Sequence, residues 1–149
     1  MNILYCGDKP MQKGILLSSM SLIGNVEEPL NIYILTVDYS EKGVNYNPVD
    51  KAFAKYLERK LNKSDIGVNV FLVDVTRYFV EELPEANMQS RFTACCMLRL
   101  FADKTDIKER VLYLDTDVLC RKDFSDFYYQ NMDGIEIAGV SDYYGRWLF

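Results

Sequence analysis

The sequence contains no histidine, and this absence removes several kinds of active site. A Ser-His-Asp triad or a Cys-His pair cannot form within the chain, because both use an imidazole as the base. A zinc site is also disfavoured, since the four cysteines include no C-x-x-C pair and no histidine can complete a site. We therefore expect Cys6, Cys95, Cys96 and Cys120 to be reduced residues of a cytoplasmic protein.

Long apolar runs and an excess of basic residues are also missing. No run is long enough to span a bilayer, and the N-terminus, MNILYCGDKP, lacks the basic region and apolar stretch of a signal peptide. The net charge of −5 argues against a nucleic-acid partner bound through phosphates. We interpret the basic cluster around RKLNK as a solvated helix face, in which Lys55 and Arg59 pair with Glu58 and Asp65. Peripheral membrane contact and homo-oligomer formation remain open.

Short apolar runs alternate with longer amphipathic segments along the chain. The apolar runs predict five strands, at residues 2–6, 31–37, 68–73, 111–114 and 135–140. The segments between them predict helices at residues 12–23, 49–62 and 88–102, with shorter helical turns within 74–84 and 124–129. This alternation is typical of an α/β fold with a mainly parallel sheet covered by helices on both faces. With no repeats or Gly/Ser-rich linkers, we expect a single domain over residues 1–149.

Every predicted strand leads into at least one aspartate. In strand order these residues are Asp8, Asp38, Asp74, the pair Asp115 and Asp117, and Asp142. Open parallel sheets bind their ligands outside the carboxyl ends of the strands, so these side chains should gather at the binding edge. For Asp38 and Asp74 a turn or a helix cap is the simpler interpretation.

The stretch RVLYLDTDVLC places two carboxylates, Asp115 and Asp117, at the end of an apolar strand. Two such groups repel each other and are costly to desolvate, and a divalent cation would offset both penalties. Oxygen ligands favour Mn²⁺ or Mg²⁺. In a regular strand the two side chains would point to the same side and could share one metal ion. A surface acid pair at a strand–loop junction is the alternative that the spacing alone leaves open.

A charged residue falls within the apolar stretch MQSRFTACCMLRLFAD. Helical spacing places Met88, Phe92, Cys95 and Arg99 on one face that should pack on the sheet. An arginine in such a position needs a partner. The candidates are the aspartates at the sheet edge and an anionic ligand such as a phosphate, and both can hold together.

Four stretches of the chain, in order and with compatible spacing, resemble the retaining glycosyltransferases of family eight. They are NILYCGD, TACCMLRLFAD, VLYLDTDVLCRKDFSDFY and GIEIAGVSDY, of which the third is the most specific. The resemblance implies the Rossmann-like GT-A fold of nucleotide-diphospho-sugar transferases. It also implies metal-dependent transfer of a hexose, from UDP-glucose or UDP-galactose, to a saccharide or glycolipid acceptor with retained configuration. Lipopolysaccharide or other cell-surface polysaccharide synthesis is the family's common bacterial context.

The resemblance also implies roles for individual residues around the diphosphate. Asp115 and Asp117 would bind the Mn²⁺ (or Mg²⁺) that bridges the UDP diphosphate, where the metal neutralises charge on the leaving group. Thr116 would lie against the ribose. Arg99 would lie near the donor sugar and the pyrophosphate, and Asp142 would contact the sugar.

The nucleoside side of the resemblance includes one departure from the family pattern. Cys6, Gly7 and Asp8 would line the nucleoside site, with Asp8 reaching the uracil. The family commonly follows this aspartate with a polar residue and an aromatic that stacks on the base, whereas residues 9–11 here are Lys-Pro-Met. Met11 could cover a base face, but with less specificity for uracil.

A second departure concerns the part of the family that follows the D-x-D motif. The family completes its metal site with a downstream histidine, and this sequence has none and ends at Phe149. We therefore expect an N-terminal portion of a longer glycosyltransferase domain, truncated at its C-terminus. One alternative is a truncated or degenerate nucleotide-binding protein without turnover. Another is a haloacid-dehalogenase-like Mg²⁺-dependent phosphatase with an Asp nucleophile, although Val118 and Leu119 replace the Gly-Thr usual in that class.

Overall fold

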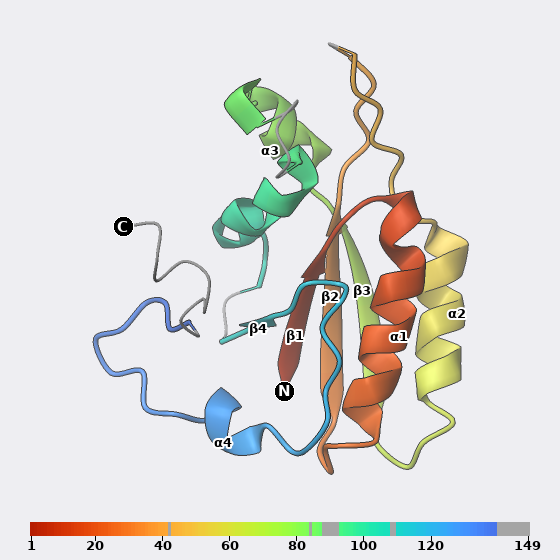
Figure 1. Ribbon diagram of the computed structural model, residues 1–149, viewed down its shortest axis with the longest axis vertical. Coiled ribbons are helices and arrows are strands. Elements are labelled where there is room, and N and C mark those ends of the chain that lie inside the picture. The colour runs from red at the N-terminus through yellow and green to blue at the C-terminus, as the bar shows by residue number, and fades with distance from the viewer. Residues whose placement is uncertain (42, 84, 88–92, 108–109, 140–149) are drawn as a thin grey trace.

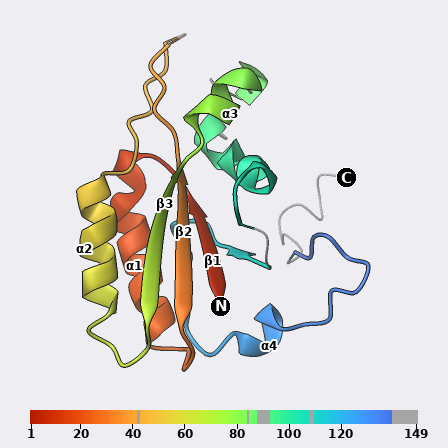
Figure 2. The ribbon, with the colours of Figure 1, turned by 180° about the vertical axis from the view of Figure 1, so that it is seen from behind.

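A parallel four-stranded sheet forms the centre of the protein in the computed structural model, which describes residues 1–41, 43–83, 85–87, 93–107 and 110–139. The sheet order is β3-β2-β1-β4. The strands are β1 (Asn2–Cys6), β2 (Leu30–Thr36), β3 (Val68–Asp74) and β4 (Leu112–Tyr113). All three pairings are parallel, and Figures 1 and 2 show the strand ends gathered at common edges of the sheet.

Two helices cover one face of the sheet side by side, as both views show (Figures 1 and 2): α1 (Gln12–Ile23) and α2 (Lys51–Leu61). Alternate strand residues such as Ile3, Ile32 and Ile34 point to this side and are fully buried there. The helices meet them with residues spaced three and four apart, such as Leu57 and Leu61 on α2. This packing is what the apolar spacing of the two segments predicts.

Shorter elements cover the opposite face near the carboxyl ends of the strands. They are α3 (Thr76–Glu81) and η3 (Ala94–Lys104), joined through η2 (Glu85–Asn87). The short helix η1 (Lys9–Met11) leads from β1 into α1, and α4 (Ser125–Tyr128) follows β4. Phe79 of α3 and Leu98 of η3 are fully buried against Leu4 and Leu35 of the sheet. Helical elements therefore lie on both faces, which confirms the predicted α/β architecture. Within the described ranges, no helix combines the length and apolar character needed to cross a membrane.

The predicted strand at residues 135–140 is wrong over its described part. Residues 135–139 form no strand, and Ile137 is 88% exposed. Two physical reasons account for the difference. The edge strand β4 is only two residues long and offers a short ladder for pairing, and among the described residues no apolar layer covers Ile135 and Ile137.

The predicted helix at residues 88–102 also differs from the structure. Residues 88–92, including Met88 and Phe92, lie outside the described part, and Ala94–Lys104 is a 3₁₀ helix rather than an α-helix. Its buried side chains, Cys95, Leu98 and Phe101, recur every three residues, which is the 3₁₀ period. Arg99 therefore lies off the buried stripe and is exposed, so the predicted apolar setting of this arginine is wrong.

Candidate functional site

The pairing of β1 with β4 brings the predicted site residues to one edge of the sheet. Leu4 pairs with Tyr113, and the Leu114 N–H donates to the Leu4 carbonyl at 3.0 Å. Because the two strands are parallel, the residues that follow them leave the sheet at the same level. Asp8 and the Asp115–Asp117 segment thus share the carboxyl edge, where open α/β sheets bind ligands.

The D-x-D segment is a turn and not a continuation of the strand. The Val118 N–H donates to the Asp115 carbonyl at 3.1 Å, which closes a four-residue turn through Thr116 and Asp117. The premise of a regular strand that aims both carboxylates to one side is therefore wrong. Both carboxylates are exposed, so the turn presents them to a ligand arriving from solvent.

A glycine of α1 lets this turn approach the helix closely. A Cβ at Gly14 would lie 2.6 Å from the Thr116 carbonyl oxygen and 3.0 Å from its Cβ. Beyond the turn, the blue segment in Figure 1 runs along α1, and the Cys120 N–H donates to Ser21 Oγ at 2.8 Å. The position of the turn is therefore set by contacts with α1 on either side of it.

Tyr113 connects Arg99 with Asp115. Its hydroxyl donates a hydrogen bond to the Asp115 carboxylate, and the Arg99 guanidinium carbon lies 4.3 Å from the centroid of its ring. Burial, and next the hydrogen bond to Asp115, raise the pKa of Tyr113, so the phenol remains a donor at all ordinary pH values. The sequence alone did not point to this tyrosine. The feature of the sequence that could have indicated it is its position two residues before Asp115, which puts its side chain on the same side of the strand as η3, the helix that carries Arg99.

Arg99 is held by a second contact of its own. Its Nε–H donates to the Cys96 carbonyl at 2.7 Å, which holds the guanidinium beside the middle of η3. Of the two partners predicted for Arg99, a sheet-edge aspartate forms no ion pair with it within the described residues, and the guanidinium stacks on Tyr113 instead. The exposed guanidinium keeps N–H groups for an anionic ligand.

Asp8 and its neighbours form the buried part of the site. Asp8 is only 9% exposed, and burial raises the pKa of its carboxyl group above the usual range. Cys6 is buried beside it on β1, and desolvation raises the pKa of its thiol to about 12, so the sulfur stays protonated. A Cβ at Gly7 would lie 2.6 Å from Met11 Sδ, which places the Met11 side chain directly against this glycine.

The two exposed carboxylates are suited to a hard divalent cation. Among the residues that the structure describes, no group of three Asp, Glu, Cys or His residues could hold a metal by itself. Asp115 and Asp117 supply two oxygen donors, and no described cation is paired with either of them. This set fits Mg²⁺ or Mn²⁺, which commonly bind through one or two carboxylates and take water and phosphate oxygens at the other positions.

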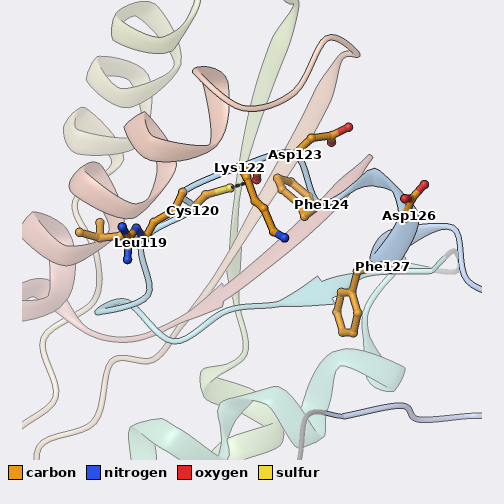
Figure 3. A pocket seen from close by; sticks show the side chains of 8 residues that line it. Leu119, Cys120, Lys122, Asp123, Phe124, Asp126 and Phe127 are labelled. Carbon is orange, nitrogen blue, oxygen red and sulfur yellow. Dashed lines mark hydrogen bonds between the residues drawn. The ribbon is translucent and has the colours of Figure 1, made fainter.

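An open hollow of about 530 Å³ lies beyond the turn, between Leu119 and Phe127 (Figure 3). Its wall carries both signs of charge, from Arg121 and Lys122 and from Asp123 and Asp126, and two α4 residues, Asp126 and Phe127, line it. The Asp123 carboxylate accepts the Ser125 N–H at 2.9 Å, and the hydrogen bonds from Ser125 hold the pKa of Asp123 below its usual range. The hollow borders the D-x-D segment without including either aspartate.

The remaining aspartates predicted at strand ends are Asp38, Asp74 and Asp142, and the first two lie next to Thr76 of α3. The Asp74 carboxylate accepts the Thr76 N–H at 2.9 Å at the start of α3, and the Asp38 N–H donates to Thr76 Oγ1 at 2.9 Å. The Asp74 contact agrees with the turn interpretation, whereas the bond at Asp38 involves only its backbone. Asp142 lies outside the described residues.

Comparisons with known proteins show the family and the fold of the chain. The family model described as Glycosyl transferase family 8 matches residues 2–148. A crystal structure of galactosyltransferase LgtC in complex with donor and acceptor sugar analogs has the same fold, with a TM-score of 0.64 and 18% sequence identity over 89% of this chain. The matched region spans 43% of the LgtC chain. A search of curated proteins gave no match.

Proposed function

Because the chain belongs to glycosyl transferase family 8, we propose that it forms the donor-binding part of a metal-dependent retaining hexosyltransferase. The proposed donor is UDP-glucose or UDP-galactose, and the proposed acceptor is a saccharide or glycolipid. The observation that carries the proposal is the cluster at one sheet edge of the exposed pair Asp115 and Asp117, the Tyr113-stacked Arg99, and the buried Asp8.

On this proposal Asp115 and Asp117 hold a divalent cation against the UDP diphosphate. When bound, the cation supplies charge neutralisation for the departing diphosphate. Tyr113 keeps the Asp115 carboxylate in one orientation through its hydrogen bond. Arg99, held in place by the Cys96 carbonyl, directs its free N–H groups to a phosphate or donor-sugar oxygen.

The nucleoside half of the proposed site lies around the end of β1. On this proposal Asp8 would accept a hydrogen bond from uracil, and Cys6 and Gly7 would line the nucleoside site. Met11, which packs on Gly7, would cover one face of the base where an aromatic residue is common in the family. Thr116 would lie against the ribose, between the two carboxylates.

The proposal extends to the acceptor and to the cellular process in which the enzyme acts. LgtC was crystallised with donor and acceptor sugar analogs, which supports a sugar donor and a sugar acceptor for a member of this fold. We propose a cytoplasmic enzyme acting in lipopolysaccharide or cell-surface polysaccharide synthesis. Family membership leaves the phosphatase alternative without support. A protein that binds nucleotide without turnover remains an outcome of the test below.

A nucleotide panel with two readouts tests the proposal. Thermal stabilisation of the chain would be compared for UDP, UDP-glucose, UDP-galactose, ADP and GDP, each with and without Mn²⁺. Release of UDP from each sugar donor would be measured in parallel. We expect metal-dependent stabilisation by the uridine nucleotides and not by ADP or GDP. Equal stabilisation by all five would contradict a uracil site, whereas selective binding without UDP release would identify a binding protein without turnover.

A further inference from the structure

The outer face of the two-helix layer carries a charge opposite to that of the whole chain. The sequence has 22 acidic and 17 basic residues, yet α1 contains no acidic residue and α2 contains only Glu58. The basic residues of the two helices and of the turn after α2 are Lys13, Lys51, Lys55, Arg59, Lys60 and Lys63. A chain with net negative charge thus concentrates cations on one layer.

The two acids of this layer, Glu58 on α2 and Asp65 in the turn after it, are outnumbered by its six cations. Glu58 accepts the Val70 N–H at 3.1 Å and so turns toward the edge strand β3, away from the outer face. Within the described residues, no salt bridge joins Lys55 to Glu58 or Arg59 to Asp65, so the predicted pairing of this cluster is wrong. The cations remain available to an external anion.

Apolar side chains lie among these cations. Leu17 is 61% exposed and Met20 is 41% exposed on α1, and Tyr56 is 40% exposed on α2. Helical spacing puts Leu17 and Met20 on the side of α1 opposite the buried Ile15 and Leu22. Because Ile15 and Leu22 are buried against the sheet, this side of α1 is turned away from it, and Figures 1 and 2 show α2 running alongside α1. The outer face is therefore both basic and apolar.

A small hollow marks the most basic part of this face. It has a volume of about 150 Å³ and is lined by Tyr56, Arg59, Lys60 and Lys63. Three cationic side chains around a tyrosine suit a phosphate group, because Arg and Lys donate to phosphate oxygens and tyrosine tolerates a half-wet interface.

We propose that this helix-layer face binds a bilayer that contains anionic phospholipid. The face is defined by Lys13, Leu17, Met20, Tyr56, Arg59, Lys60 and Lys63. Its cations contact lipid phosphates, while Leu17 and Met20 enter the boundary between headgroups and acyl chains. The mixture of basic and apolar groups on paired helices matches an anionic lipid surface, whose charge complements that of the face. This inference does not depend on the proposed donor site.

Docking on this face would also orient the D-x-D turn. Lys13 precedes Gly14, the residue against which Thr116 packs, so the turn lies close to the docked surface. If the proposed function holds, this position brings the donor near an acceptor that is anchored in lipid. The consequence rests on that function, whereas the membrane contact itself does not.

Co-sedimentation with vesicles tests the proposal without nucleotide or metal. Vesicles of phosphatidylcholine alone would be compared with vesicles that also contain phosphatidylglycerol, at low and high salt. We expect binding to the anionic vesicles only, with release as salt screens the charges. Equal binding to both vesicle types, or no binding to either, would overturn the proposal.

Matched charge reversals locate the surface. Arg59→Glu and Arg77→Glu change the net charge equally at exposed helical arginines, but Arg77 lies on α3 at the opposite side of the sheet, paired with Glu81. We expect Arg59→Glu to weaken vesicle binding by about ten-fold or more and Arg77→Glu by less than about two-fold. Equal losses would show a general charge effect and contradict a defined face. Circular dichroism would verify that both variants are folded.

The double change Leu17→Ser/Met20→Ser tests the apolar contribution separately. It should reduce vesicle binding while leaving its salt dependence in place, because the cations are unchanged. Binding of the wild-type chain to soluble polyglutamate would be measured as well. If the wild type bound polyglutamate but no vesicles, the face would be assigned to an acidic protein partner, which would contradict the proposal.

Discussion

The absence of a side chain at Gly14 of α1 leaves the space that Thr116 of the D-x-D turn occupies. A Cβ at position 14 would lie 2.6 Å from the Thr116 carbonyl oxygen, a distance that real Cβ atoms do not adopt. The obstructing atom belongs to the backbone and cannot rotate away. The position of the turn that carries Asp115 and Asp117 thus depends on a glycine about one hundred residues earlier in the chain.

Replacing Gly14 with alanine should therefore displace the turn. Alanine gains about 1 kcal/mol of helix propensity, which offsets part of an overpacking cost of about 1–3 kcal/mol. We expect a small loss in the free energy of unfolding, measured by urea denaturation, and a larger loss of metal-dependent UDP affinity.

Gly24 provides the matched control for this change. It lies at the other end of α1 with φ −85°, and a Cβ there would meet nothing within 4 Å. Gly24→Ala should leave UDP affinity unchanged. Equal affinity for UDP in the wild type and Gly14→Ala would show that the close approach does not position the site.

The hydrogen bond from Tyr113 to Asp115 leads to a second prediction. Tyr113→Phe keeps the ring under Arg99 and removes only the hydroxyl. Groups that hold a metal ligand in place typically contribute about 10–100-fold to metal affinity, so we expect a loss of Mn²⁺ affinity near the lower end. Electron paramagnetic resonance of free Mn²⁺ measures it. Tyr129→Phe, which removes an exposed hydroxyl bonded to Glu28, should leave Mn²⁺ affinity unchanged.

The burial of Asp8 leads to a third prediction, on stability against pH. Burial raises the pKa of Asp8 above its ordinary value of 3.8, so the folded protein binds this proton more tightly than the unfolded chain. The contribution of Asp8 to stability is therefore fully present below pH 3.8 and declines as pH rises through the raised pKa.

Asp8→Asn removes this ionisation. We expect the variant to be more stable than the wild type at neutral pH, with the difference shrinking toward acid pH, and to bind UDP more weakly. Thermal melts across the pH range measure the first effect. A variant that is less stable at neutral pH would show that the carboxylate has compensating contacts and would contradict the burial argument.

The alternation of apolar runs was sufficient to predict most of the fold. The helix at Gln12–Ile23 has its predicted bounds, and the strands at residues 2–6 and 68–73 lie within a residue of β1 and β3. These elements could be predicted because each has one buried face with a regular period. The strand predicted at 135–140 failed because local apolar composition does not reveal whether a neighbouring strand offers a pairing edge.

Less of the candidate site than of the fold could be predicted from the sequence. The spacing of the D-x-D motif identified the two carboxylates, but Tyr113 and Gly14 became evident only when strand pairing and helix packing were known. The misplacement of Arg99 has a related cause, since α-helical and 3₁₀ periods diverge after two turns and only packing decides between them. The roles given to Cys6, Gly7, Thr116 and the aspartates stay predictions until ligand binding is measured.

The most direct test of the central claim is a calorimetric titration of UDP into the chain, with and without Mn²⁺, on the wild type and on Asp117→Asn. Asp117 is exposed and has no hydrogen bond or ion pair within the described residues, so the substitution should leave stability unchanged. Asp65→Asn, at an exposed aspartate in the turn before β3, is the control. We predict Mn²⁺-dependent UDP binding in the wild type and the control, lost in Asp117→Asn. UDP binding that is equally strong without Mn²⁺, or unchanged in Asp117→Asn, would contradict the account.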